Sequence, residues 1–333
     1  MLPAHCNINN VTMRGDVDFV SKLDEASKKK AKEELNEIND KDREMAVQAF
    51  REWILQQKWL RTPTDFAFLL RFLRARKFSQ LGARQTIENY WRVKTKSPTW
   101  FKDVDPTEKK IVEIMKTGFY VIPKTTDKYG RRVIVERLGN LDMNKVKKKW
   151  GVENIFRTIC LICDWVNRDE NVQVNGIIVF IDNTDVTMGH FMNMMGTENG
   201  KKIMEFYQNS LPARMKGLHM YNEPTFFDAV YALFSPLMKQ KTKDRMHMHG
   251  RSLTKVYEEL GMECFPDEYL PDDYKGPSAG STQQLVDTMI SEIQSPDFTS
   301  YIKNLSSDKY GVDIAKLKEN DAPVASFRKL NVD

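Results

Sequence analysis

Gly176-Ile177-Ile178-Val179-Phe180-Ile181 is an unbroken apolar run near the middle of the chain. A strand with one solvated face alternates apolar and polar residues, whereas a strand that is covered on both faces shows a continuous apolar run. Strands covered in this way belong to parallel sheets with helices packed on both sides. We therefore expect residues 176–181 to form a central strand of a mainly parallel sheet.

Strand-like and helix-like segments alternate on both sides of this run. A turn at Asp127-Lys128-Tyr129-Gly130 joins the first two strand-like segments, and its glycine suits a tight turn. The expected flanking strands are residues 119–122, 131–138, 216–221 and 246–249. The expected helices are a long one at 152–166, segments up to Ser210 and one from Pro224. Such alternation predicts an α/β domain with right-handed crossovers.

The first 98 residues have a helical pattern throughout. Helix formers run from about Asp24 to Trp59, and a further helix is expected at 79–96. Between them Phe66, Leu69, Leu70 and Leu73 recur at helical spacing. We therefore expect a helical domain over 1–98, the α/β domain over 99–280, and one helix with a loosely held polar tail over 281–333.

The bulk composition limits the classes of partner. Lys and Arg number 51 against 46 Asp and Glu, so the formal charge of +5 is too small for a protein that coats nucleic acid. No stretch approaches the roughly 20 apolar residues that span a bilayer, and the chain shows no signal-peptide pattern at its start. The cysteines, four in all, fit a reducing compartment. We expect a cytoplasmic monomer that associates with membranes transiently and binds no nucleic acid.

The patterns that resemble catalytic or metal sites are incomplete. Gly276-Pro-Ser278-Ala-Gly280 matches a hydrolase nucleophile elbow, but it follows a turn-like segment and no histidine lies downstream. His247 and His249 lack a further ligand at a suitable spacing, and Cys160 and Cys163 lie inside an expected helix. We therefore expect no enzyme activity, no cofactor and no metal site.

Residues 226–238 form an expected helix that is apolar over much more than one face. Phe226, Phe227, Val230, Leu233, Phe234, Leu237 and Met238 exceed the roughly 100° stripe that packing on one side needs. The cations Lys239, Lys241, Lys243 and Arg245 follow directly. Two interpretations remain open on this segment alone. The helix either dips into an anionic bilayer and anchors at the headgroups, or is a buried core helix with a solvated end.

Several motifs resemble those of one known family of lipid-binding proteins. They are Phe68-Leu-Leu-Arg71-Phe-Leu-Arg74-Ala-Arg76, Asp127 through Val133, Asn175 through Asp182, Leu211 through His219, Asn222-Glu223-Pro224, Pro236-Leu237 and Arg245 through Gly250. On these residues the chain resembles the CRAL-TRIO family over about residues 40 to 276. The loop Leu270 to Gly276 departs from the family pattern. Two pocket positions that are serine in one member are Ile159 and Cys163 here.

The resemblance implies an apolar pocket above the sheet, a movable helical lid that starts near Pro224, and a basic phosphoinositide-binding cleft. The cleft would fall on Arg74, Arg214, Lys241 and Arg245, with Lys216 beside them. The candidate pocket residues are Phe156, Ile159, Cys163, Val179, Ile181, Phe206, Leu218, Phe227, Val230 and Phe234.

The expected function is to bind and transfer a small hydrophobic lipid, such as a retinoid or tocopherol, with docking and release that depend on membrane phosphoinositides. An alternative is a phosphoinositide-binding trafficking adaptor without a transfer role. A lipid-processing hydrolase is a third class, which the missing downstream histidine disfavours.

Overall fold

The computed structural model describes residues 19–317, and a five-stranded sheet forms the centre of their fold. The strand order is β2 (Tyr120–Val121), β3 (Arg132–Glu136), β4 (Ile177–Asp182), β5 (Met215–Tyr221) and β6 (Met246–Met248). Strand β2 pairs antiparallel with β3, and the other three pairings are parallel. The predicted mainly parallel sheet is confirmed, and the apolar run around Val179 is its central strand.

The register of the sheet divides β4 into two faces. Ile134 lies opposite Val179, and Val179 lies opposite Leu218, so these three residues form one row on the same face. Phe180 points to the other face, where it packs against Phe265 and Tyr269 with ring centroids 5.1 and 5.4 Å away. Since both faces of β4 are apolar, both must be covered.

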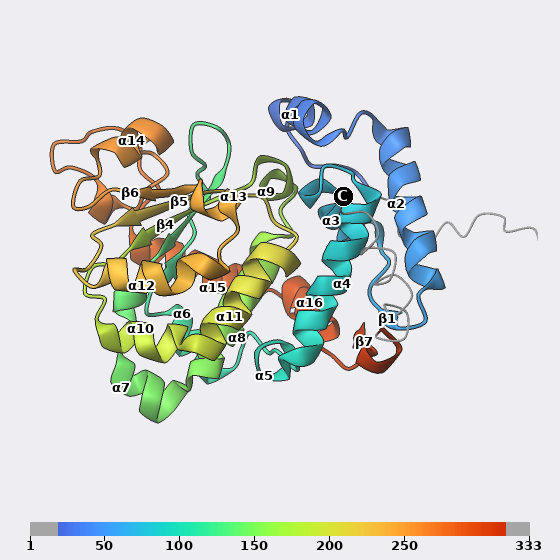
Figure 1. The fold of residues 1–333 in the computed structure, drawn as a ribbon. Coiled ribbons are helices and arrows are strands. Elements are labelled where there is room, and N and C mark those ends of the chain that lie inside the picture. The colour runs from blue at the N-terminus through green and yellow to red at the C-terminus, as the bar shows by residue number, and fades with distance from the viewer. Residues whose placement is uncertain (1–18, 318–333) are drawn as a thin grey trace, which may run out of the picture.

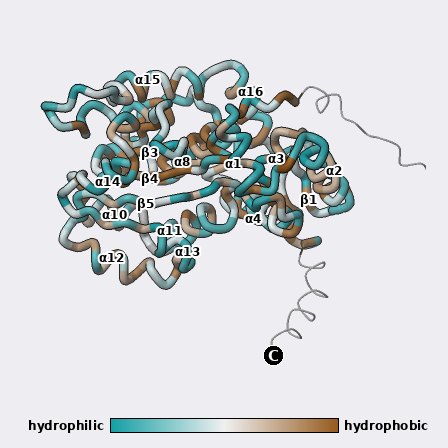
Figure 2. The backbone as a smooth tube through the Cα atoms, turned by 90° about the horizontal axis from the view of Figure 1, so that it is seen from above, coloured by the Kyte–Doolittle hydropathy of each residue, from teal (hydrophilic) through white to brown (hydrophobic). Residues whose placement is uncertain are grey.

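Helices lie on both sides of this sheet (Figures 1 and 2). Helices α10 (Met188–Met195), α11 (Thr197–Glu205) and α12 (Phe227–Phe234) lie below the strands in Figure 1, whereas α14 (Thr254–Leu260) lies above. A π-helical turn (Phe206–Ser210) continues α11, and α13 (Gln240–Lys243) leads into β6. The long predicted helix is α8 (Val152–Val166), and α6 (Lys109–Met115) and α9 (Glu170–Asn175) complete the domain.

The N-terminal helices stand beside the sheet (Figure 1). They are α1 (Glu25–Leu35), α2 (Asp40–Gln56), α3 (Phe66–Ala75), α4 (Gln80–Lys96) and α5 (Pro98–Phe101). The helix expected from Asp24 to Trp59 is in fact two helices. Asn36 ends α1 in the left-handed conformation, φ 64°, and the Asn39 side chain caps α2.

The segment after residue 280 is more ordered than expected, up to residue 317. It holds two helices, α15 (Thr282–Ile293) and α16 (Pro296–Leu305), where we expected one. Strand β7 (Gly311–Val312) then pairs with β1 (Leu60–Arg61) of the N-terminal helical region. The cap Ser295 and the proline after it start the second helix, and that signal was missed. Residues 318–333 of the expected tail lie outside the described residues.

Arg74 joins the N-terminal helices to the α/β domain. Its Nε and Nη2 each donate to a different oxygen of Glu37 at 2.8 Å, and its Nη1 donates to Glu170 and Gln173 at 3.0 Å. Arg74 is fully enclosed, with 0% of its surface exposed. A planar guanidinium suits this bidentate pairing. One side chain thereby links α3, the end of α1 and the start of α9.

Replacing Arg74 with methionine should destabilise the protein by about 3–5 kcal/mol, because two carboxylates in a buried place lose their closest ion-pair partner, and Glu37 keeps only Arg43 at 3.4 Å. Urea unfolding measures the change. Adding Glu37→Met to Arg74→Met should recover part of the loss, since one unpaired carboxylate is then gone. The control is Lys29→Ala. Lys29 forms an exposed ion pair with Glu33, so its loss should change the free energy of unfolding little. An unchanged stability in Arg74→Met would contradict the linking role.

Candidate functional site

A cavity of about 620 Å³ lies on the face of the sheet that carries Ile134, Val179 and Leu218. Its volume is within the range of small-molecule pockets, roughly 300–1,000 Å³. Strands β2 to β5 form one wall and the end of α8 forms another. A third wall comes from the end of α11 with the π-helical turn after it and from residues 239–245. The apolar lining residues are Ile134, Cys163, Val166, Ile177, Val179, Ile181, Met204, Leu211, Ala213, Met215 and Leu218.

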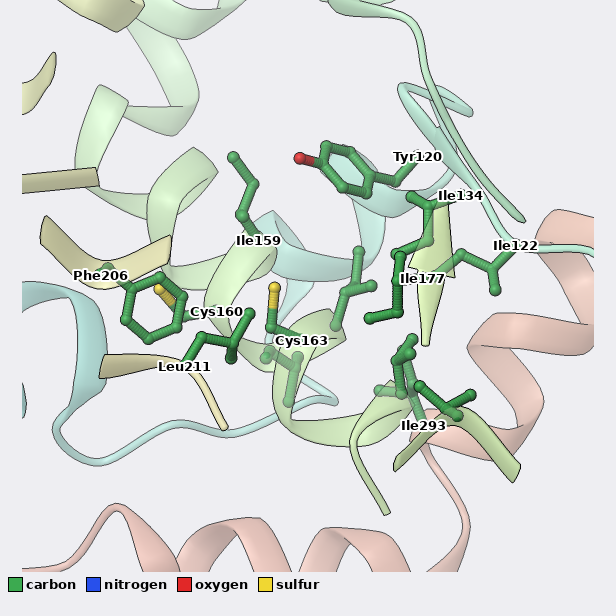
Figure 3. Packing of buried hydrophobic residues seen from close by; sticks show 14 of the residues in the cluster. Tyr120, Ile122, Ile134, Ile159, Cys160, Cys163, Ile177, Phe206, Leu211 and Ile293 are labelled. Atoms are coloured by element: carbon green, nitrogen blue, oxygen red, sulfur yellow. The ribbon is translucent and has the colours of Figure 1, made fainter. Parts of the chain in front are cut away.

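Four of the ten predicted pocket residues line this cavity, namely Cys163, Val179, Ile181 and Leu218. The three that lie on strands follow from the alternation of side chains along β4 and β5. Figure 3 shows Cys163 on α8 next to Ile177, with the ring of Tyr120 above both in this view. That a ligand contacts these residues stays a prediction.

The other six predicted pocket residues do not line the cavity. Phe156 stacks on Trp100 at 4.3 Å, and Phe206 packs against Phe101 at 5.4 Å. Ile159 is buried in the same core. Phe227, Val230 and Phe234 lie on α12, which does not line the cavity. Helices α8 and α12 are apolar on several faces, so helical spacing alone does not tell which face meets the cavity.

Sequence reasoning missed a polar cluster on the cavity wall, formed by Tyr120, Glu136 and Tyr207. The Tyr120 hydroxyl donates to Glu136 Oε2 at 2.9 Å, and the Tyr120 and Tyr207 hydroxyl oxygens lie 3.4 Å apart. Burial raises the pKa of Glu136 above its usual range, although the hydrogen bond from Tyr120 opposes this. The sequence could have revealed this cluster, because Glu136 lies two residues after Ile134 and therefore on the same, inward face of the strand.

Cations gather around the same cavity. Arg214, Lys241 and Arg245 line it as predicted, and Arg76, Lys77, Lys216 and Lys239 join them. We call these seven residues the cationic rim. Burial and the nearby Arg245, Arg76, Lys77 and Arg214 lower the pKa of Lys241 below its usual range. Since these cations repel the charge of Lys241, residues from three segments that are distant in the sequence lie close enough to affect one another electrostatically.

Negative charge compensates only part of the cationic rim. Glu34 accepts from Arg214 at 2.8 Å and from Lys216 at 3.3 Å, and it is the acidic side chain paired with the rim among residues 19–317. Lys77 and Lys241 form no ion pair with any described residue. Arg245 donates to the main-chain carbonyl of Met215. The rim therefore has uncompensated positive charge that an external anion can neutralise.

The prediction that Arg74 belongs to the basic cleft is wrong. Arg74 is enclosed between Glu37 and Glu170 and does not line the cavity. Arg76 lines it instead. Residues two positions apart on a helix point about 200° away from each other, so Arg74 and Arg76 leave α3 in nearly opposite directions. Lys77 follows with a positive φ of 53°, which turns the chain toward the rim.

His219, His247 and His249 form a stack on the opposite face of the sheet. His219 lies opposite His247 in the parallel register, and its Nδ1 is 3.0 Å from His249 Nε2. Burial and the neighbouring His247 and His249 lower the pKa of His219 to about 3, so it is neutral near pH 7. One ligand atom each from His219, His247 and Glu259 lie within 4.8 Å of one another. The rings of His219 and His247 are nearly parallel, at 17°, so their lone pairs do not converge on one point.

The remaining catalytic patterns lie in settings that do not support catalysis. Ser278 is in a loop between a short 3-10 turn and α15, and its hydroxyl donates to Asp267 rather than to a histidine. Cys160 and Cys163 lie inside α8, where burial raises the pKa of both thiols. The cysteines within the described residues, Cys160, Cys163 and Cys264, are free. Cys6 lies outside the described residues.

A second hollow of about 780 Å³ lies between α3, α8, α9 and α16. Its charged lining is largely paired, as in Arg132 with Asp169 and Arg168 with Asp297, both at 2.8 Å. This hollow is therefore less suited to an apolar ligand than the cavity beside β4. Among the described residues no helix has both the length and the apolar character needed to cross a membrane.

The sequence and the fold were compared with known families, proteins and structures. Residues 115–276 match the CRAL/TRIO domain, and residues 39–111 match the Pinta-like UBA domain. Mouse Clavesin-2 is 32% identical over 244 residues, which are 72% of each chain. The mouse alpha-tocopherol transfer protein-like protein is 31% identical over 252 residues, covering 75% of this chain and 71% of its own. The crystal structure of Sfh5 superposes with a TM-score of 0.48 at 15% identity, over 86% of this chain and 98% of that one.

A mainly parallel α/β domain with a largely apolar cavity on one sheet face is an architecture suited to binding a hydrophobic ligand. The chain belongs to the CRAL/TRIO family, which confirms the resemblance drawn from its motifs. Membership supports lipid binding or transfer as the general class of function. The domain boundaries at residues 98 and 280 stay predictions.

Proposed function

We propose that the protein holds one small hydrophobic lipid in the cavity beside β4 and carries it between membranes, docking on phosphoinositides through its cationic rim. The observation that carries the proposal is that one cavity has apolar walls and a cationic border. An apolar molecule gains about 25 cal/mol for each Å² of apolar surface removed from water. The border can meet an anionic headgroup while the walls hold the lipid.

The apolar helix α12 supports docking on a membrane. Phe234 packs inward against Phe191 at 5.4 Å, whereas Leu233 and Leu237 are 55% and 40% exposed. Met192 on the neighbouring α10 is 61% exposed. These residues favour the bilayer interpretation of the segment over the buried core helix, because a core helix would not leave such large side chains exposed. Cations near an anionic bilayer contribute about 1 kcal/mol each.

The wall that opens is, in this proposal, the segment from Leu237 to Thr242. The Gln208 side chain donates to the Leu237 carbonyl at 3.0 Å and accepts from the Lys239 amide at 2.7 Å and the Thr242 hydroxyl at 3.2 Å. The sequence analysis expected the helix that starts near Pro224 to be the movable lid. We propose instead that the segment after α12 moves. An anion that binds Lys241 competes with these contacts and favours release.

The proposal includes a location in the cytoplasm, transient association with anionic membranes, and no catalytic activity. A phosphoinositide-binding adaptor that does not transfer lipid remains the alternative. It shares the cationic rim but gives the apolar cavity no role. Loading of the cavity and transfer of its content therefore distinguish the two functions.

Filling the cavity should prevent loading. Leu218 is partly exposed within the cavity, so Leu218→Trp adds bulk without creating a void or an unpaired charge. We expect lipid loading to fall at least tenfold, as measured by mass spectrometry of the intact protein after incubation with a lipid extract. Leu233→Trp, on the exposed face of α12, should load normally. Equal loading of both variants would show that the lipid is not held beside β4.

Reversing the charge of Lys241 and Arg245 to Glu should weaken binding to vesicles that contain phosphatidylinositol bisphosphate by about 30-fold or more, since at least about 2 kcal/mol is lost. Transfer of a loaded fluorescent lipid to these vesicles should slow accordingly. The matched control is Lys243→Glu with Lys255→Glu, which changes the net charge equally but leaves the rim intact. Equal transfer by both double variants would rule out the rim as the docking site.

A further inference from the structure

The apolar cavity carries one cluster of polar side chains that the proposed docking does not use. Tyr120 comes from β2, Glu136 from the end of β3 and Tyr207 from the π-helical turn after α11. Three separate elements thus bring polar atoms to one place on a wall that is otherwise made by residues such as Val179 and Cys163.

The cluster has hydrogen-bonding capacity that the described residues leave unused. Glu136 Oε2 accepts from the Tyr120 hydroxyl at 2.9 Å, but Oε1 accepts from no described residue. The Tyr207 hydroxyl lies 3.4 Å from that of Tyr120, at the long limit for a hydrogen bond. Glu136 Oε1 therefore remains as an acceptor for a further partner. The single hydrogen of the Tyr207 hydroxyl serves only the long contact with Tyr120 and an interaction with the Cys163 sulfur, so it can turn to a stronger acceptor.

The electrostatics of Glu136 point to the kind of partner. Burial raises its pKa, and the hydrogen bond from Tyr120 is the contact that opposes this. No cation of the rim pairs with Glu136. A carboxylate or phosphate beside it would meet like charge, and a hydrocarbon would leave its oxygen unpaired in an apolar place, which is costly.

We propose that Glu136 and Tyr207 recognise a hydroxyl group, so that the carried lipid is an alcohol that donates to Glu136 Oε1 and accepts from the Tyr207 hydroxyl. The inference rests on the proposed lipid-carrying function and adds the chemical class of the cargo. A hydroxyl both donates and accepts, whereas an ether or a ketone only accepts. A site built to hydrogen-bond a hydroxyl rejects analogues that lack it far more strongly than an apolar wall rejects a methylene.

The test uses three ligands with the same flexible chain, namely 1-hexadecanol, 1-methoxyhexadecane and hexadecanoic acid. Dissociation constants come from titration of the full chain, cleared of bound lipid, by mass spectrometry of the intact protein. The wild type should prefer the alcohol to the ether by roughly 5- to 150-fold, the worth of one or two hydrogen bonds. The acid should bind more weakly than the alcohol.

Substitutions test whether Glu136 and Tyr207 cause the preference for the alcohol. Glu136→Met and Tyr207→Phe should each reduce the preference for the alcohol toward onefold, while Glu136→Gln keeps an acceptor and most of the preference. Tyr129→Phe removes a hydroxyl from an exposed turn that does not line the cavity and should keep the full preference. Thermal unfolding of each variant separates a loss of fold from a loss of selectivity.

The possible outcomes separate the two proposals. Equal binding of alcohol and ether by the wild type, tighter binding of the acid, or a preference that survives both Glu136→Met and Tyr207→Phe would overturn hydroxyl recognition and leave lipid carriage intact. Binding of none of the three ligands by a folded wild type would overturn lipid carriage itself.

Discussion

The central strand β4 is apolar on both faces, and the rest of the fold follows from the need to cover both of them. On one face Phe180 is buried against Phe265 and Tyr269. On the other face the covering elements leave a cavity of about 620 Å³ beside Val179. Protein interiors normally pack without such voids, so the gap is the candidate ligand site of this domain.

Charge is distributed around that gap in two ways. Arg74 is neutralised by Glu37 and Glu170 and holds the N-terminal helices in place, whereas Lys77 and Lys241 carry positive charge without a paired carboxylate among the described residues. In the first arrangement the pairing offsets the free energy that it costs to remove the charges from water. The second raises the free energy of the isolated protein and is relieved by an anion. The end of α3 thus supplies one cation for structure, and three residues later Lys77 supplies another that is available for binding.

The sequence predicts the strand residues of the site better than the helix residues. Val179, Ile181 and Leu218 line the cavity because strand side chains alternate strictly and the apolar run identifies the strand. Phe156 and Ile159 do not, because α8 is buried on most sides and its rotation depends on contacts with other elements. Arg74 and Arg76 could not be told apart for a similar reason. Glu136 was predictable from its place in β3, since a carboxylate on an inward strand face signals a site.

The most direct test of the account is whether the chain, purified without detergent and then exposed to a mixed lipid extract, holds lipid in its cavity. Mass spectrometry of the intact protein gives the number of bound molecules, and fragmentation of the released ligand gives its chemical class. The account predicts one molecule of a lipid alcohol for each chain. A folded chain that stays empty, or that binds many lipids without a fixed stoichiometry, would contradict it.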